Sequence, residues 1–245
     1  MKIVCCLSWY DESPAWLASV VAAAAKAGCN HIVAVDGPYA LLTATGRSSG
    51  VLQQDAVTHA AHVAGIGLTL HVPDSPFGGN EVEKRSLMFR LAEQITTEDD
   101  WLWVLDADCF VTKAVDLRRR LQETDLNAAE VMVRNSSDPQ VIKVSNHKQP
   151  IRLLYRAMRG LEVAGAHYFY RYPVDDGFSY LWGQPPLEPA LELHDVEVEH
   201  WSEQRDQLRQ AEQQAYYHRR SEVGAERVHE TWVEGVNGQP VKLRG

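Results

Sequence analysis

The 245-residue chain has little of what marks secreted, membrane or disordered proteins. It has only four cysteines, with no C-x-x-C pair, so we predict buried, reduced thiols and a cytosolic location. The longest mainly apolar stretch, Ala15–Ala25, has 11 residues including one serine and is too short to cross a bilayer. The first residues lack the apolar stretch and cleavage site of a signal peptide. Because 45% of residues are apolar, disorder is excluded as well.

Two phosphate-binding motifs are also missing. No G-x-G-x-x-G follows the first predicted strand, which disfavours a dinucleotide-binding fold. No G-x-x-x-x-G-K-[ST] occurs anywhere, which excludes a P-loop.

The charge is acidic overall but unevenly distributed. The net charge is −9, yet residues 134–171 carry seven Lys/Arg against two Asp/Glu, a net +5, so the rest carries −14. Such a basic segment in an acidic chain indicates either an anion-facing surface or an ordinary solvated face.

The first half of the chain alternates between strand and helix patterns. The predicted strands are Lys2–Leu7, His31–Val35, Leu68–Val72 and Trp101–Leu105, and the predicted helices are Ala15–Lys26, Val51–Ala64 and Glu81–Gln94. This alternation predicts an α/β fold with a doubly wound, mostly parallel sheet.

The pattern changes after residue 112. We predict helices at Lys113–Gln122, Ile151–Arg159 and Ser202–Glu222, and strands at Glu130–Arg134, Gln140–Ser145, Ala166–Tyr172 and Leu191–Glu199. We expect residues 1–115 and a smaller lobe, 116–230, to be two halves of one domain, with a loosely held tail at 231–245.

Asp106-Ala107-Asp108 is the sharpest motif in the chain. About one D-x-D is expected by chance in a chain with 15 aspartates, so its position carries the information. It follows the apolar strand Trp101–Leu105, where ligands bind in open parallel sheets. Two carboxylates there favour Mg²⁺ or Mn²⁺ bridging a diphosphate, although Asp108 could instead cap a helix.

Four segments together resemble the nucleotide-sugar half of GT-A fold glycosyltransferases, most closely the family-2-like group. They are Ser8–Glu12, Asp36, Lys84-Arg85 and the run WLWVLDAD ending at Asp108. The resemblance covers about the first 115 residues and rests on the order and spacing of the motifs, each of which is weak alone. It implies a GT-A-like fold and a nucleotide-diphosphate sugar as donor, most often a UDP-sugar.

The same resemblance assigns roles around that donor. Asp36 contacts the nucleoside, Lys84 or Arg85 the nucleotide, and Asp106 and Asp108 the ribose and the metal. The segment after the first strand supplies further donor-binding residues, namely Ser8, Tyr10 and Glu12. The alternatives are an Asp-Gly turn at Asp36 and a solvated helix face at Lys84-Arg85.

Members of this group often supply another metal ligand from a late histidine, for which His194 and His200 are the candidates. Strand parity places Val196, Val198 and His200 on the core-facing side, so His200 at the strand end can reach the edge of the site. The alternative is a structural core histidine.

The second half should receive the acceptor. Asp175 or Asp176 is the candidate base for an inverting transfer, with a simple turn as the alternative, and a retaining enzyme needs no such base. Arg152, Arg156 and Arg159 fall on one face of the predicted helix. With the aromatic residues nearby, they suit an anionic acceptor such as a hydroxymethylated base flipped out of DNA. A glycan, a small phosphorylated metabolite or a protein is also allowed.

The sequence therefore predicts a metal-dependent glycosyltransferase that transfers a hexosyl or pentosyl group to a hydroxyl acceptor, with no membrane partner. A nucleotidyltransferase acting on a sugar phosphate is the alternative enzyme, although it commonly has a Gly-rich basic loop where this chain has Ser8–Glu12. A non-catalytic module that binds nucleotide-sugars or nucleic acid is the third interpretation.

Overall fold

The computed structural model describes most of the chain. The described residues are 1–38, 50–77, 81–135, 148–164, 169–183, 186–201, 232–234 and 240–242. Among them, no helix is both long and apolar enough to span a membrane.

The elements of the first half follow the predicted alternation. They are β1 (Ile3–Ser8), α1 (Pro14–Lys26), β2 (His31–Val35), α2 (Val51–Ala64), β3 (Gly67–His71), α3 (Glu81–Glu93) and β4 (Trp101–Asp106). Ser13 caps α1 through its side chain, which accepts from the Trp16 amide, and Pro14 occupies the first turn. Gly65, in the left-handed conformation, ends α2.

The second half is richer in strands than the sequence predicts. Its elements are β5 (Cys109–Ala114), α4 (Leu117–Glu123), β6 (Ala128–Asn135), β7 (Lys148–Arg156), β8 (Glu162–Ala164), β9 (Phe169–Val174), β10 (Gly177–Trp182) and β11 (Ala190–His200). In the predicted tail, β12 (Trp232–Glu234) and β13 (Pro240–Lys242) pair with each other.

One large sheet organises the molecule, in the strand order β3-β2-β1-β4-β7-β6-β11-β5. The first four strands are parallel, β7 is antiparallel to β4 and β6, β11 is parallel to β6, and β5 closes the order antiparallel to β11. Strands β6, β7 and β11, from the predicted smaller lobe, therefore extend the same sheet. The separate small sheet is β10-β9-β8.

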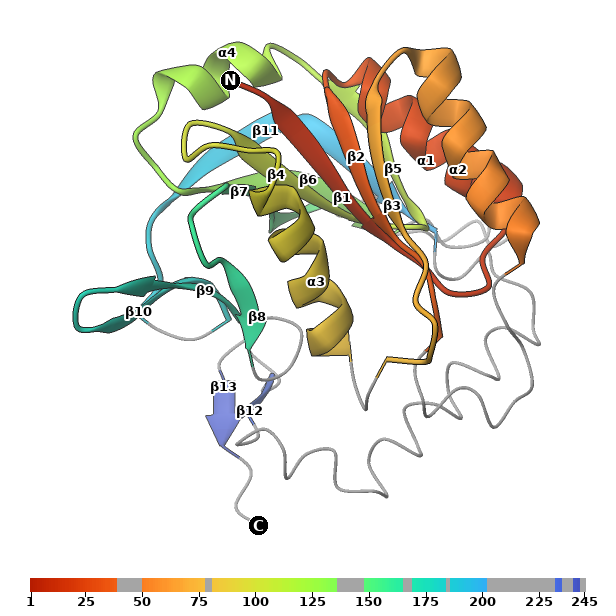
Figure 1. The fold of residues 1–245 in the computed structure, drawn as a ribbon. Helices are drawn as coiled ribbons and strands as arrows, with labels where there is room; N and C mark the ends of the chain where they lie inside the picture. The colour runs from red at the N-terminus through yellow and green to blue at the C-terminus, as the bar shows by residue number, and fades with distance from the viewer. Residues whose placement is uncertain are drawn as a thin grey trace.

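The large sheet has an apolar core on each face. Leu17 of α1 and Val57 of α2 pack on one face, and Met88 and Phe89 of α3 pack on the other (Figure 1). The strand Trp101–Asp106 is buried on both faces, which explains its unbroken apolar sequence. The structure thus confirms the predicted α/β class and the mostly parallel sheet with helices on both faces.

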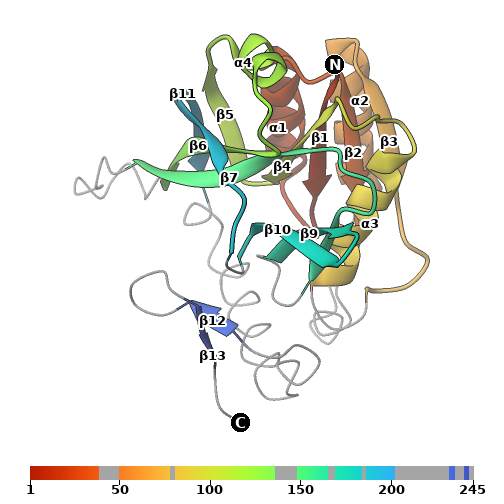
Figure 2. The same ribbon diagram turned by 90° about the vertical axis from the view of Figure 1, so that its left-hand side faces the viewer.

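The small sheet lies beside α3 (Figure 2). The Ser86 hydroxyl of α3 donates to the Val163 carbonyl of β8 and accepts from the Val163 amide, at 3.2 and 3.1 Å. These two bonds attach the small sheet to the helix that covers the central strands.

Two predicted helices are wrong. Ile151–Arg159 falls largely in β7, because β4 and β6 supply hydrogen-bonding partners on both its sides. Lys113–Gln122 is divided between β5, which pairs with β11, and the short helix α4. The predicted elements Gln140–Ser145 and Ser202–Glu222 lie outside the described residues.

Candidate functional site

The candidate site lies at the carboxyl ends of the central parallel strands. Ser8 at the end of β1 is paired with Asp106 of β4 and with Val35 of β2, so the residues that follow these strands share one edge of the sheet. The structure brings Asp36 and Asp106, two of the residues predicted from sequence, to this edge.

Asp108 and His200 meet at the same edge. Strands β5 and β11 place Cys109 opposite His200, and the Trp201 amide donates to the Asp108 carbonyl at 2.9 Å. The His200 Nε2 atom lies 3.2 Å from Oδ2 of Asp108, whose side chain is only 2% exposed. The other candidate, His194, is exposed and lies 2.9 Å from Glu192 instead.

Cys109 is the third member of this group. Its Sγ lies 4.0 Å from Oδ1 of Asp108, and one donor atom each from Asp108, Cys109 and His200 lie within 4.8 Å of one another. Burial, reinforced by the carboxylates of Asp106 and Asp108, raises the pKa of the Cys109 thiol well above its ordinary value. The sequence interpretation took Cys109 for a core thiol, although its position next to Asp108 was a usable signal.

Aromatic side chains support the end of β11 beside this group. The rings of Phe110 and Trp201 lie 4.5 Å apart, and Trp16 of α1 packs edge-on against both, at 6.1 and 6.0 Å. Since Trp201 follows His200 directly, this packing fixes the backbone that presents the imidazole.

Asp106 has a different partner. Its Oδ1 accepts a hydrogen bond of 2.7 Å from Nη2 of Arg85, a buried residue of α3. The structure therefore places Asp106 with a guanidinium and leaves it out of the group formed by Asp108, Cys109 and His200.

Lys84 is buried inside the framework of the site. Its Nζ donates to the Trp9 carbonyl and, at 2.8 Å, to the Gly37 carbonyl, which joins the segments after β1 and β2. Gly37 has a φ of 117°, and an added Cβ would lie 2.4 Å from Cγ of Pro73, so only glycine fits there. In this arrangement Lys84 orders the segments after β1 and β2 by holding their carbonyls.

Asp36 is also held by internal donors. Its Oδ1 accepts from the Gly37 amide at 2.6 Å, and its Oδ2 accepts from Nε2 of Gln54, on α2, at 3.0 Å. The predicted donor-binding residues Ser8, Tyr10 and Glu12 are buried at the same edge. The contacts of Asp36 and Lys84 thus hold the segments that follow β1 and β2 at the edge of the candidate site.

The three arginines predicted to form an acceptor-binding face are separated. Arg152 pairs with Glu130 at 2.8 Å, and Arg156 donates to the backbone carbonyls of Leu126 and Thr124. Arg159 is 88% exposed. Residues four apart in a strand lie about 13 Å apart, and Arg159 lies beyond the end of β7, so the helical face on which this prediction depended does not exist.

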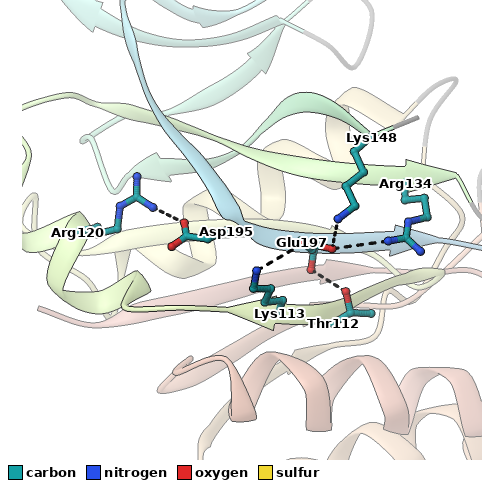
Figure 3. A network of polar contacts seen from close by, with 7 residues as sticks. All are labelled: Thr112, Lys113, Arg120, Arg134, Lys148, Asp195 and Glu197. Atoms are coloured by element: carbon teal, nitrogen blue, oxygen red, sulfur yellow. Dashed lines mark hydrogen bonds and ion pairs between the residues drawn. The ribbon is translucent and has the colours of Figure 1, made fainter. Parts of the chain in front are cut away.

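Other basic residues of the 134–171 segment are paired across the sheet. Figure 3 shows Glu197 of β11 between Lys148, at 2.6 Å, and Lys113 and Arg134, each at 3.8 Å. Arg134 also lies 3.6 Å from Glu199. Arg134 and Lys148 are therefore paired with carboxylates from outside the segment.

Asp175 and Asp176 lie in the exposed turn between β9 and β10. In Figure 1 this hairpin points away from the carboxyl ends of β1 and β4. The structure thus does not bring either carboxylate together with Asp108 and His200.

No protein-family model and no curated protein matches this chain. Solved structures similar to it include S. aureus TarS residues 1–349, with 14% identity and a TM-score of 0.43 over 64% of this chain and 47% of TarS. The same TarS segment in complex with UDP-GlcNAc gives 13% identity and a TM-score of 0.42, over 64% and 46%. A mycobacterial protein gives 12% identity and a TM-score of 0.47, over 99% and 83%. The chain spans about half the length of these TarS chains, and likenesses at such TM-scores carry no conclusion about activity.

Proposed function

We propose that this chain is a glycosyltransferase that uses a divalent cation and a nucleotide-diphosphate sugar, a UDP-sugar in the first instance. The contact between Asp108 and His200 carries the proposal. It unites the second carboxylate of the D-x-D motif with the late histidine that the GT-A resemblance implies, at the sheet edge where ligands bind.

The donor set of this group fits a cation. A carboxylate that is 2% exposed is costly unless a positive charge or hydrogen-bond donors compensate it, and an imidazole nitrogen lies 3.2 Å away. Asp108 and His200 would hold the ion, which the sequence predicts to be Mn²⁺ or Mg²⁺. When bound, such an ion stabilises the charge that develops on a diphosphate leaving group.

The remaining residues of the site would position the donor. Arg85 holds the Asp106 carboxylate, and Lys84 holds the loops after β1 and β2, so these strand ends keep one geometry. Asp36, oriented by Gln54 and Gly37, marks the nucleoside end of the proposed site. Rigid positioning of this kind lowers the entropic cost of bringing donor and acceptor together.

For the acceptor we propose a hydroxyl group on a molecule that is not a polyanion. A hydroxymethylated base in DNA was suggested by the arginine face and the net +5 of residues 134–171. Arg152 and Lys148 are instead paired with Glu130 and Glu197. Asp175 and Asp176, as turn residues, do not support the proposed role of acceptor base.

Replacing Asp108 by Asn tests the proposal. The variant should lose transfer by about 10²-fold or more, because it removes the ion's only carboxylate in the group. Release of nucleoside diphosphate from a panel of nucleotide sugars, with and without Mn²⁺, measures it. The matched control is Asp195→Asn, since Asp195 lies in the middle of β11 and pairs with Arg120, away from the Asp108 group.

The products distinguish the two alternatives. A nucleotidyltransferase would form a nucleotide sugar and pyrophosphate from a sugar phosphate and a nucleoside triphosphate. A binding module would be stabilised by a nucleotide sugar in a thermal melt without turnover. Either result would contradict the proposed glycosyltransferase, whereas full activity of the Asp108→Asn variant would contradict the metal-binding role proposed for Asp108.

A further inference from the structure

The ligand group assembled by the structure differs from the one that the D-x-D motif implies. The motif offers two carboxylates, but Asp106 is engaged by Arg85 at 2.7 Å. The group formed around Asp108 contains a thiol and an imidazole, from Cys109 and His200. Its three donor atoms are therefore one oxygen, one sulfur and one nitrogen.

The distances suit a single bound ion. Atoms bonded to one tetrahedral Zn²⁺, with bonds of roughly 2.0–2.3 Å, lie about 3.3–3.8 Å apart. In the structure, Oδ2 of Asp108 lies 3.2 Å from Nε2 of His200, and its other oxygen, Oδ1, lies 4.0 Å from Sγ of Cys109. One donor atom from each of the three residues can be chosen so that all three fall within 4.8 Å of one another. Small side-chain movements would complete this geometry.

The backbone supports the group from both strands. Cys109, the first residue of β5, is paired with His200 of β11, and the Trp201 amide donates a hydrogen bond to the Asp108 carbonyl. All three ligands are thereby fixed by one antiparallel ladder, which reduces the ordering cost of binding an ion.

We propose that Asp108, Cys109 and His200 form a site for a thiophilic divalent cation of the Zn²⁺ or Co²⁺ class. Thiolate and imidazole ligands favour such ions, whereas Mg²⁺ and Mn²⁺ prefer oxygen. The inference rests on the proposed function for two of its ligands, Asp108 and His200. Because Zn²⁺ binds such sites more tightly than Mn²⁺, we expect it to displace Mn²⁺ here.

Cobalt gives a direct test on the full chain without any nucleotide sugar. Co²⁺ bound to a thiolate produces a charge-transfer absorption band in the near ultraviolet. The wild type should show this band with one Co²⁺ per chain and lose it when Zn²⁺ is added. Cys109→Ser should abolish the band, and Cys29→Ser, which removes another buried thiol, should keep it.

Two measurements guard against a variant that fails to fold. Far-ultraviolet circular dichroism checks Cys109→Ser, and X-ray absorption of Zn²⁺-loaded wild type should report one sulfur ligand. Absence of the cobalt band, or its persistence in Cys109→Ser, would overturn the proposal, as would a purely nitrogen and oxygen environment for zinc. None of these readouts involves sugar transfer, so they fail independently of the proposed glycosyltransferase.

Discussion

Lys84 illustrates how burial changes the role of a charged residue. Its side chain is 1% exposed, and its Nζ donates to the carbonyls of Trp9 and Gly37. A lysine is almost never fully buried unless it is paired, and here backbone oxygens supply the compensation. Lys84, which the sequence predicts to contact the nucleotide, thus joins the segments that follow β1 and β2.

Replacing Lys84 by Met should lower the free energy of unfolding by about 2–4 kcal/mol, because two buried carbonyls lose their donor. Urea denaturation measures the change. As the control, Lys26→Met at the exposed end of α1 should shift stability by less than about 0.5 kcal/mol. An unchanged midpoint together with weaker nucleotide-sugar binding would support the original nucleotide-contact interpretation instead.

Residues near the site were predicted to different degrees. The positions of Asp106 and Asp108 followed from the apolar strand before them, and His200 followed from strand parity. The pairing of Asp106 with Arg85 and the place of Cys109 did not, because both depend on side chains from elements distant in sequence. The local sequence pattern predicts where a residue lies along its strand, but it does not predict which side chain from another element contacts that residue.

The same distinction applies to the elements. The alternating first half was predicted well, because each helix and strand there shows its own periodicity. β7 was mistaken for a helix, on one face of which the arginines at 152, 156 and 159 would have fallen. What makes it a strand is the hydrogen bonding offered by β4 and β6, and no local pattern contains that information.

The ion pairs around Glu197 connect β5, β6, β7 and β11. A hydrogen bond from Lys148 lowers the pKa of Glu197, and the charges of Lys148, Lys113 and Arg134 lower it further. A carboxyl whose pKa is lowered by folding stabilises the fold above its unfolded pKa, and this contribution is lost as the pH falls through the folded value.

Glu197→Gln should therefore lower stability by about 1–2 kcal/mol at pH 7. The difference from wild type should shrink as the pH falls below the ordinary carboxyl value of 4.5. Urea denaturation across this pH range measures it, with Glu192→Gln, at the exposed pair with His194, as the matched control. A difference that stays constant with pH would show that the charge of Glu197 does not stabilise the sheet.

At the scale of the whole molecule, folding pairs most of the described cations of residues 134–171 with carboxylates from outside that segment. These pairs are Arg134 with Glu199, Lys148 with Glu197, Arg152 with Glu130, and Arg159 with Glu93. A net charge counted along the chain is therefore a poor guide to the field at its surface.

This balance leads to a prediction for nucleic acid. A protein that binds DNA through its phosphates releases counterions, so its affinity falls steeply with salt. With most of the described cations of residues 134–171 paired and a net charge of −9, this chain should bind a hydroxymethylated duplex no better than about 10⁻⁴ M at physiological salt. Fluorescence anisotropy across a salt series measures this.

A substitution of the exposed Arg159 tests whether this segment contributes to DNA binding. Its side chain is 88% exposed and its ion pair with Glu93 is long, at 3.8 Å, so among the described cations of this segment it is the most available to a phosphate. Arg159→Ser should leave the anisotropy and its salt dependence unchanged. Micromolar affinity that falls with salt and weakens in this variant would restore an anionic acceptor, and sugar transfer to the duplex would identify it as DNA.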